Sequence, residues 1–314
     1  MQETPSGQGV SHITIEDADA GQRIDNFLAK RLPGLPRSHI YRIIRTGQVR
    51  VNSSRIKPTR KLVAGDTIRV PPVRDAQGKQ FSVPDSFINT VESSVIYEDE
   101  RVLAVNKPAG LAVHAGSGLN FGVIEALRQS RDDRRYELIH RLDRYTSGCL
   151  LIGKTLAATR LFQDHFRQRT VEKKYIAIVA GNWIVTDETV ANRLSSNVEI
   201  SGERMVVEDD LGKTAISHFT TLTAFASASE VSVLIETGRT HQIRVHCCGS
   251  GHPVIGDNKY GDKQTNRRFK QLGLSRMFLH AEQLSIDAEL QLSCSVDAEW
   301  QSARRILSST KPRA

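Results

Sequence analysis

The short apolar run from Cys149 to Ile152 constrains the fold of this chain more than any other feature. It is bounded by Gly148 and Gly153, and an apolar run of this kind between turn residues predicts a strand buried in a sheet. The polar segment from His140 to Ser147 would then lie at the rim of that sheet. A rigid scaffold can hold side chains towards a ligand at such a rim.

Asp143 is the carboxylate of this polar segment, and Arg141 and Arg144 flank it. Nearby cations favour the ionised form of a carboxylate. An ionised, fixed aspartate can act as a nucleophile, a general base or a metal ligand. These few residues leave all three roles open, and many Asp–Arg neighbours are only solvated charges in a turn.

The length and composition of the chain limit the classes of protein it can form. A chain of 314 residues can hold one large and one small domain. No stretch approaches 18 consecutive apolar residues, and residues 1–10 lack the pattern of a secretory signal, so we expect no membrane span and no export. The four cysteines include no CxxC pair, which predicts neither a disulfide framework nor a zinc site. We therefore expect a cytoplasmic protein.

The positive charge is concentrated in one small segment. Residues 23–74 contain 13 Lys and Arg against 2 Asp and Glu, a local charge of +11, whereas residues 75–314 contain 30 bases and 29 acids. A basic cluster of this kind is typical of a nucleic-acid-binding module.

Four stretches can be assigned from the pattern of apolar and turn residues. We expect a flexible tail over 1–20, a basic domain over 21–74, a linker over 75–94 and a large domain over 95–314. Within the basic domain, two helices precede strands near 49–51 and 67–70. Four arginines on or near the second helix can reach phosphates: Arg37, Arg42, Arg45 and Arg50.

Two helices of the large domain are also predicted. The segment 155–169 should be helical, and its expected buried face consists of Leu156, Leu161, Phe162 and Phe166. Thr240 is a plausible N-terminal cap for a short helix that carries Gln242 and Arg244.

Several motifs together resemble the RluA-type pseudouridine synthases. They are "HRLDRYTSG", "VLAVNKPAG", "VEKKY", "ETGRTHQIRVH" and "GHPVIGDNKYGD", and "LPRSHIYRIIRTGQVRVN" is similar to an S4 RNA-binding domain. The resemblance implies an α+β fold, in which a small S4-like domain precedes a catalytic domain built on a mixed, mainly antiparallel sheet. It also implies isomerisation of uridine to pseudouridine in RNA.

The same resemblance assigns roles to residues. Asp143 would be the essential nucleophile or base, and the sequence leaves open whether it attacks the sugar or the uracil ring. Arg244 would pair with Asp143, Tyr175 would stack on the uracil, and Arg141 would help to hold the space left by a flipped nucleotide. No cofactor is expected, because the reaction needs neither redox chemistry nor an energy source. A GxGxxG loop and an HExxH motif are both absent, so neither a nucleotide cofactor nor a metal is expected.

The substrate implied by the resemblance is 23S ribosomal RNA, because segments such as "HAGSGLNFGVIEAL" and "MFLHAEQL" are most similar to family members that modify the large subunit. A transfer RNA substrate remains open, and we expect a monomer. Two alternatives also remain. One is an assembly factor that only binds RNA, and the other is a metal-dependent RNA hydrolase with Asp143 as a metal ligand.

Overall fold

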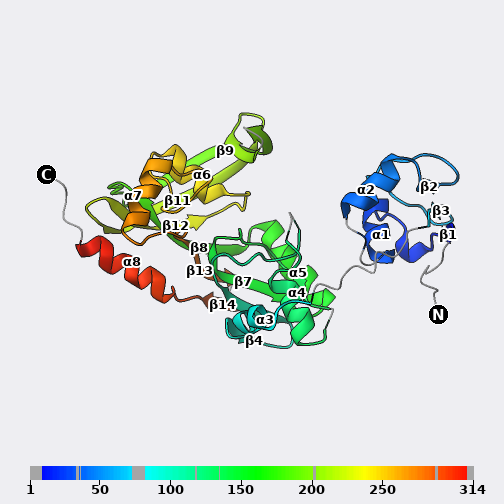
Figure 1. Ribbon diagram of the computed structural model, residues 1–314, viewed down its shortest axis with the longest axis horizontal. Coiled ribbons are helices and arrows are strands. Elements are labelled where there is room, and N and C mark those ends of the chain that lie inside the picture. Colours follow the sequence, from blue (N-terminus) through cyan, green and yellow to red (C-terminus); the bar gives the residue numbers. More distant parts are fainter. Residues whose placement is uncertain are drawn as a thin grey trace. The chain divides into compact units, whose positions relative to one another are not determined.

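The computed structural model describes residues 9–32, 35, 37–72, 82–116, 119–133, 135–200, 203–286 and 289–309. The chain divides into two compact units, Met1–Ser82 and Val83–Ala314 (Figure 1). In the described residues, no helix is both long and apolar enough to cross a membrane.

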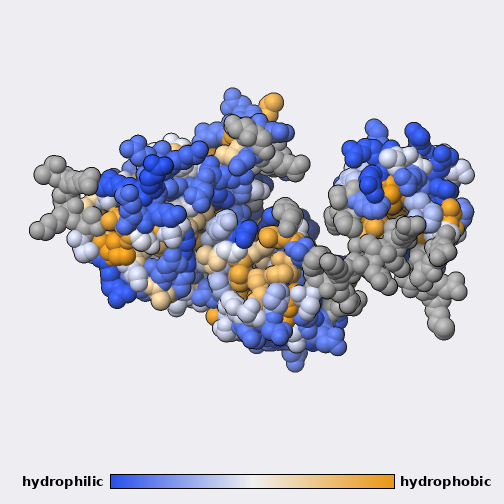
Figure 2. Space-filling view, in the orientation of Figure 1, coloured by the Kyte–Doolittle hydropathy of each residue, from blue (hydrophilic) through white to orange (hydrophobic). Residues whose placement is uncertain are grey.

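The first unit packs two helices on a small sheet. Its strands pair in the order β1-β3-β2, and both pairs are antiparallel. Its buried core is mainly aliphatic and includes Phe27 and Ile44. Its face in Figure 2 is largely hydrophilic. The elements are β1 (Ser11–Thr14), the 3-10 helix η1 (Asp17–Asp19), α1 (Ile24–Arg31), α2 (Arg37–Arg45), β2 (Arg50–Val51) and β3 (Thr67–Val70).

Part of the segment 1–20, for which we expected a flexible tail, forms secondary structure. β1 pairs with β3 over Ser11–Thr14, and Ile15 is buried in the core of the unit. The alternation of polar and apolar residues from Ser11 to Ile15 fits a strand with one buried face. Residues 1–8 lie outside the described residues.

The second unit is built on one large sheet. In its described residues, 11 strands pair, with the main order β10-β9-β11-β12-β8-β13-β7-β5-β4. β13 and β7 are parallel, and the other pairs are antiparallel, so the predicted mixed, mainly antiparallel sheet is confirmed. The strands are β4 (Val95–Glu98), β5 (Val102–Lys107), β6 (Glu137–Leu138), β7 (Ser147–Gly153), β8 (Val171–Ala180), β9 (Glu188–Ile200), β10 (Glu203–Glu208), β11 (Lys213–Ala224), β12 (Ala228–Ile235), β13 (Leu279–Ile286) and β14 (Leu290–Ser293).

The helices of this unit lie beside different parts of the sheet. In Figure 1, α3, α4 and α5 lie with the β4–β7 part, and α6 and α7 lie with the β9–β12 part. The helices are α3 (Asp85–Glu92), α4 (Val123–Ser130), α5 (Leu156–Gln168), α6 (Gln242–Gly249), α7 (Lys263–Gln271) and α8 (Ala298–Ser309).

Three local predictions differ from the structure. Helix α3 occupies part of the expected linker 75–94, and Val91 on it is buried in the core. On α5, Leu156 and Leu161 are exposed, and the buried residues are Ala158, Thr159 and Phe162. Thr155 caps this helix by accepting a hydrogen bond from the backbone N–H of Ala158, so the helix begins one residue later than predicted.

Candidate active site

The loop before β7 carries Asp143, and β7 itself is buried along its whole length, as predicted. Gly148 is required at the start of this strand because its φ is +105° and a Cβ atom there would lie 2.2 Å from the carbonyl oxygen of Ala281. β7 and β13 can therefore approach closely beside the loop. This close approach fixes the start of β7, and the loop that carries Asp143 leads into that point.

His140 ties the same loop to β7. Its Nε2 accepts a hydrogen bond from the backbone N–H of Leu151 at 3.0 Å, and its ring stacks on Phe166 with centroids 4.6 Å apart. Burial lowers the pKa of His140 to about 3, so the ring is neutral and can act as this acceptor. His140 is thus a structural residue of the loop.

Lys107 holds the other side of the loop. Its fully buried ammonium group donates to the carbonyl oxygens of Pro108 and Leu111 at 3.0 Å and of Arg144 at 3.1 Å. Burial lowers the pKa of Lys107 to about 7, but only the ammonium form supplies all three donors. Gly110 also donates its backbone N–H to the carbonyl of Arg144. The residue next to Asp143 is therefore fixed by several hydrogen bonds.

Arg244, on α6, lies between two carboxylates. Its Nη1 donates to Oδ2 of Asp143 at 3.1 Å, and its Nε and Nη2 donate to the two carboxylate oxygens of Asp257 at 2.7 and 2.8 Å. Burial alone would lower the pKa of Arg244, but the hydrogen bonds and charges of Asp257 and Asp143 outweigh it and raise the pKa. Burial likewise acts to raise the pKa of Asp257, and Arg244 outweighs it, so this pKa is lowered. Arg244 and Asp257 therefore form a charged, bidentate pair in the interior.

The side chain of Gln242 fixes the position of the first turn of α6. Its side chain is buried, its Oε1 accepts from Thr237 Oγ1 and the backbone N–H of Arg239, and its Nε2 donates to the carbonyl of Ile216 and to Ser217 Oγ. Each of these partners lies on β11 or in the turn before α6. The first residue of the helix is therefore joined to the sheet and the turn by four hydrogen bonds.

The predicted cap of α6 is wrong. The helix begins at Gln242, and the capping position is His241, which has left-handed backbone angles of φ 54° and ψ 19°. Thr240 precedes that position by one residue. The pattern of a Thr before a helix did not show that the turn would close through the Gln242 side chain.

Tyr175 reaches the site from the middle of β8. It is half-buried, and its backbone lies between Val233 of β12 and Ala281 of β13. Burial, together with the negative charge of Asp143, raises the pKa of Tyr175. Its hydroxyl group is therefore protonated at neutral pH, and the ring offers an aromatic wall beside the carboxylate.

A pocket of about 160 Å³ joins these side chains. Among the predicted site residues, Asp143, Tyr175, Arg244 and Arg141 all line it, and Arg141 is exposed. The other walls come from the loop before β7, from β12 and β13, and from the turn before α6. The complete lining is Arg141, Leu142, Asp143, Thr146, Tyr175, Ile235, Gly238, Arg239, Thr240, His241, Gln242, Ile243, Arg244 and Leu279.

The predicted RNA-binding arginines of the first unit do not line this pocket. Arg42, Arg45 and Arg50 are exposed on α2 and β2 of that unit. Arg37 is the first residue of α2, and its side chain lies outside the described residues. The role of these arginines in RNA binding stays a prediction.

Sequence reasoning missed Asp257 and the supporting role of Lys107. Asp257 lies in "GHPVIGDNKYGD", where it follows Gly256 in a turn, and it is 1% exposed. Its position directly after an apolar stretch was a possible signal of burial, but its partner is 13 residues away on another element. In the described residues, no group of three or more His, Cys, Asp or Glu side chains could hold a metal ion.

Comparisons with known proteins identify the family of this chain. The model of the RNA pseudouridylate synthase family matches residues 101–248, and the model of the S4 domain matches residues 22–68. The chain belongs to the RNA pseudouridylate synthase family, with an S4 domain in its first unit.

Two curated relatives cover most of the chain. The chain is 48% identical to ribosomal large subunit pseudouridine synthase C of Pasteurella multocida over 277 residues, which is 87% of this chain and 85% of the relative. It is 46% identical to the protein of the same name from Escherichia coli K12 over 287 residues, which is 90% of this chain and 89% of the relative.

The fold is also similar to a solved structure. Human RNA pseudouridylate synthase domain containing 4 matches with a TM-score of 0.60 and 24% sequence identity. The match covers 73% of this chain and 98% of the human chain. This likeness concerns the fold alone. The matches to the two family models confirm the predicted order of an S4 domain followed by a pseudouridine synthase domain.

Proposed function

We propose that this protein converts uridine to pseudouridine in the large-subunit (23S) ribosomal RNA and that Asp143 is its catalytic aspartate. The observation that carries the proposal is the Asp143–Arg244 hydrogen bond at 3.1 Å inside a pocket that Tyr175 also lines. The RNA class follows from the relatives, which are named for the large ribosomal subunit.

The reaction is an isomerisation in which no group is gained or lost. The bond from N1 of uracil to C1′ of the ribose breaks, the base turns, C5 bonds to C1′, and the proton on C5 leaves while N1 gains one. Asp143 acts as the nucleophile or base in this sequence. Arg244 orients Asp143 by donating a hydrogen bond from Nη1 to its Oδ2.

Tyr175 provides a stacking surface for the uracil ring, and its protonated hydroxyl can take part in the transfer of the C5 proton. The pocket volume of about 160 Å³ is below the range of about 300–1,000 Å³ typical of drug-sized ligands. A single base fits this size better than a large cofactor. Because the reacting atoms are hidden in a stacked helix, the uridine has to be flipped out. Arg141, an exposed residue of the pocket lining, then holds the vacated space.

The first unit supplies affinity for the RNA backbone. Its exposed arginines, Arg42, Arg45 and Arg50, can contact phosphates, which gives a binding term that weakens as salt rises. We infer that the enzyme works in the cytoplasm as a monomer without a cofactor. The absence of a cofactor follows from the chemistry of the isomerisation, which has no redox step.

Pseudouridine mapping of total RNA tests this proposal. A strain that lacks the protein is complemented with the wild type or with Asp143→Asn. We expect specific 23S uridines to lose the modification and only the wild type to restore it. Loss of a transfer RNA site instead would refute the substrate, and an unchanged map would leave the RNA-binding alternative as the better explanation.

A further inference from the structure

The two oxygens of Asp143 have different surroundings. Arg244 Nη1 lies 3.1 Å and His241 Nε2 lies 3.7 Å from the same oxygen, Oδ2. In the described part of the chain, no hydrogen bond reaches Oδ1. Two nitrogen groups therefore face Oδ2, and Oδ1 is available to react.

His241 is held in an unusual backbone conformation. Its φ of 54° lies in the left-handed region, which costs energy for a residue with a Cβ, although histidine tolerates it better than most residues do. Its ring packs edge-on against Tyr260, with centroids 5.4 Å apart. Strain of this kind persists only where surrounding contacts fix it, and it is often found at functional sites.

The hydrogen bonds of Tyr260 determine which nitrogen of His241 carries the proton. The hydroxyl oxygen of Tyr260 accepts from the backbone N–H of Val206 at 3.0 Å and lies 2.7 Å from Nδ1 of His241. In the described residues, Nδ1 is the one acceptor within reach of the tyrosine proton. The arrangement that satisfies every group has Tyr260 donating to Nδ1, and Nε2 of His241 then carries a hydrogen.

The surroundings of His241 also favour its neutral form. Burial lowers the pKa of His241, and the positive charges of Arg244 and Lys259 act in the same direction, while Asp143 and Asp257 oppose them. The net shift is downward, so the ring is neutral at physiological pH. A neutral ring with Nε2–H faces Asp143 as a donor and adds no second charge to the site.

We propose that His241 is a positioning residue that, in the tautomer fixed by Tyr260, directs Nε2–H at Oδ2 of Asp143 and so leaves Oδ1 as the reacting atom. This inference rests on the proposed function. The separation of 3.7 Å is longer than a hydrogen bond, and such contacts commonly shorten when substrate enters. The hydrogen bonds from Val206 to Tyr260 and from Tyr260 to His241 thus connect strand β10 to the reacting carboxylate.

The tautomer can be measured without substrate. Nitrogen-15 NMR of the full chain, with the His241 ring assigned by comparison with His241→Gln, distinguishes a proton on Nε2 from one on Nδ1. We expect the Nε2–H form in the wild type and a mixture in Tyr260→Phe, which keeps the ring but loses the hydroxyl donor. A wild-type ring protonated on Nδ1, or on both nitrogens at pH 7, would overturn the proposal.

Kinetics separate positioning from simple packing. His241→Gln and His241→Leu both place a residue with a Cβ at the left-handed position, but only the glutamine amide can donate near the Nε2 site. We expect His241→Leu to lower kcat by about 10- to 100-fold with little change in KM, as for loss of a hydrogen bond to a charged group. His241→Gln should retain most of the activity. Equal losses in both variants, or an effect on KM alone, would contradict the proposed role.

A double-mutant cycle tests whether Tyr260 acts through His241. Tyr260→Phe should lower kcat in the wild-type background and should have little further effect in His241→Leu. Additive losses of kcat would show that Tyr260 does not act through His241. If the wild-type enzyme modifies no 23S uridine, the proposed function fails, whereas the NMR result still decides the tautomer, so the two failures are distinguishable.

Discussion

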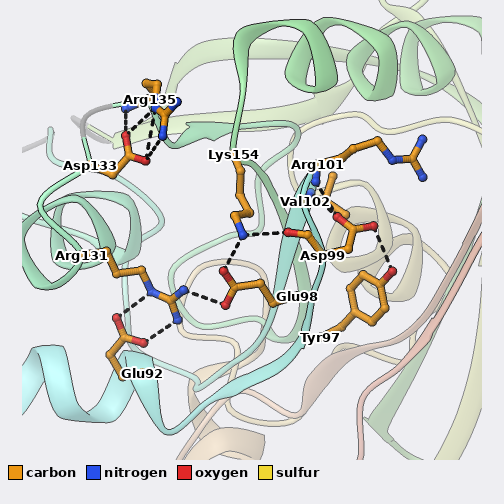
Figure 3. Close-up of polar contacts among 10 residues, drawn as sticks. All are labelled: Glu92, Tyr97, Glu98, Asp99, Arg101, Val102, Arg131, Asp133, Arg135 and Lys154. Atoms are coloured by element: carbon orange, nitrogen blue, oxygen red, sulfur yellow. Dashed lines mark hydrogen bonds and ion pairs between the residues drawn. The ribbon is translucent and has the colours of Figure 1, made fainter.

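Arg131 and Arg244 each lie between two carboxylates, and the two clusters differ in burial. Arg131 donates to Glu92 at 2.8 Å and to Glu98 at 2.7 Å, at the end of α4 (Figure 3). Arg244 donates to Asp257 and Asp143 over similar distances. The side chains of Glu92 and Glu98 are about one third exposed, whereas Asp257 is 1% and Asp143 is 24% exposed. The two clusters are alike in chemistry and unlike in access to solvent.

The Arg131 cluster links elements that are already packed. Lys154 also donates to Glu98 and to the carbonyl of Asp99, so α3, β4 and the end of β7 share one network (Figure 3). Ion pairs in contact with water contribute little to stability, because solvent competes for each charge. This network is therefore a local brace at the surface of the unit.

The Arg244 cluster is asymmetric, and the asymmetry has a chemical meaning. The buried Asp257 fixes two of the arginine nitrogens, and the third nitrogen is presented to the more exposed Asp143. One carboxylate thus orients the cation, and the other stays accessible in the pocket. In the Arg131 cluster the two carboxylates are about equally exposed, so neither one orients the arginine for the other.

The largest expected effect is on activity. Asp143→Asn keeps the shape of the side chain but removes its charge and should lower the rate of pseudouridine formation by about 10⁴-fold or more. The matched control is Glu98→Gln, which removes the corresponding charge at Arg131 and should leave the rate unchanged. Single-turnover assays on a 23S transcript measure both variants. A similar loss of activity in both would remove the distinction between the clusters.

Arg244→Met should have the largest effect on stability. It leaves Asp257 as a buried charge without its partner, and loss of one member of such a pair costs about 3–5 kcal/mol in the free energy of unfolding. Urea denaturation followed by circular dichroism measures this change. A loss of less than about 1 kcal/mol, which is the range of ion pairs at the surface, would contradict the burial argument.

Lys107→Met tests the support of the Asp143 loop. The variant fills a similar volume but removes the donor to the carbonyl oxygens of Pro108, Leu111 and Arg144, which should cost about 3 kcal/mol of stability. Because one of those carbonyls belongs to Arg144, kcat should fall as well. Denaturation and single-turnover kinetics on the same sample measure the two effects. A stable variant with full activity would show that the loop does not depend on Lys107.

Asp257→Asn should change the response of stability to acid. The folded pKa of Asp257 is lowered, so its contribution is fully present above the unfolded pKa and is lost as pH falls through the folded value. We expect the free energy of unfolding of the wild type to exceed that of Asp257→Asn by about 2 kcal/mol at pH 7. The gap should close as pH falls below about 4, the usual range of an aspartate. A gap that stays constant from pH 7 to pH 3 would contradict this linkage.

Sequence patterns predicted the parts of the molecule that depend on neighbouring residues. The apolar run of β7 and the polar loop with Asp143 are local features, and the motif containing Arg244 placed that residue in the pocket. Asp257 and His241 depend on contacts between distant elements. No spacing rule shows that a carboxylate 13 residues after Arg244 turns back to it, or that Tyr260 orients a histidine.

The errors in the predicted helices also come from contacts that the local sequence does not show. Leu156 and Leu161 have helical spacing, but tertiary packing buries the face with Ala158, Thr159 and Phe162. Helix α3 was not predicted because its segment follows a stretch that contains proline and glycine. Val91 is its buried residue, and Phe87 and Ile88 pack against the same core. The Arg131 network was not predictable either, since Glu92 is 39 residues before its partner.

The smallest expected effect is at Arg131, and its dependence on salt gives the sharpest comparison. Arg131→Met should lower the unfolding free energy by no more than about 1 kcal/mol, because Glu92 and Glu98 can be rehydrated when the arginine is removed. In about 1 M salt, where charges are screened over roughly 3 Å, this loss should shrink further. The loss in Arg244→Met should persist, since the charge left on Asp257 is shielded from ions by the protein. Denaturation curves of both variants at low and high salt measure the two losses. If salt reduced both losses equally, solvent would reach Asp257 as readily as it reaches Glu92.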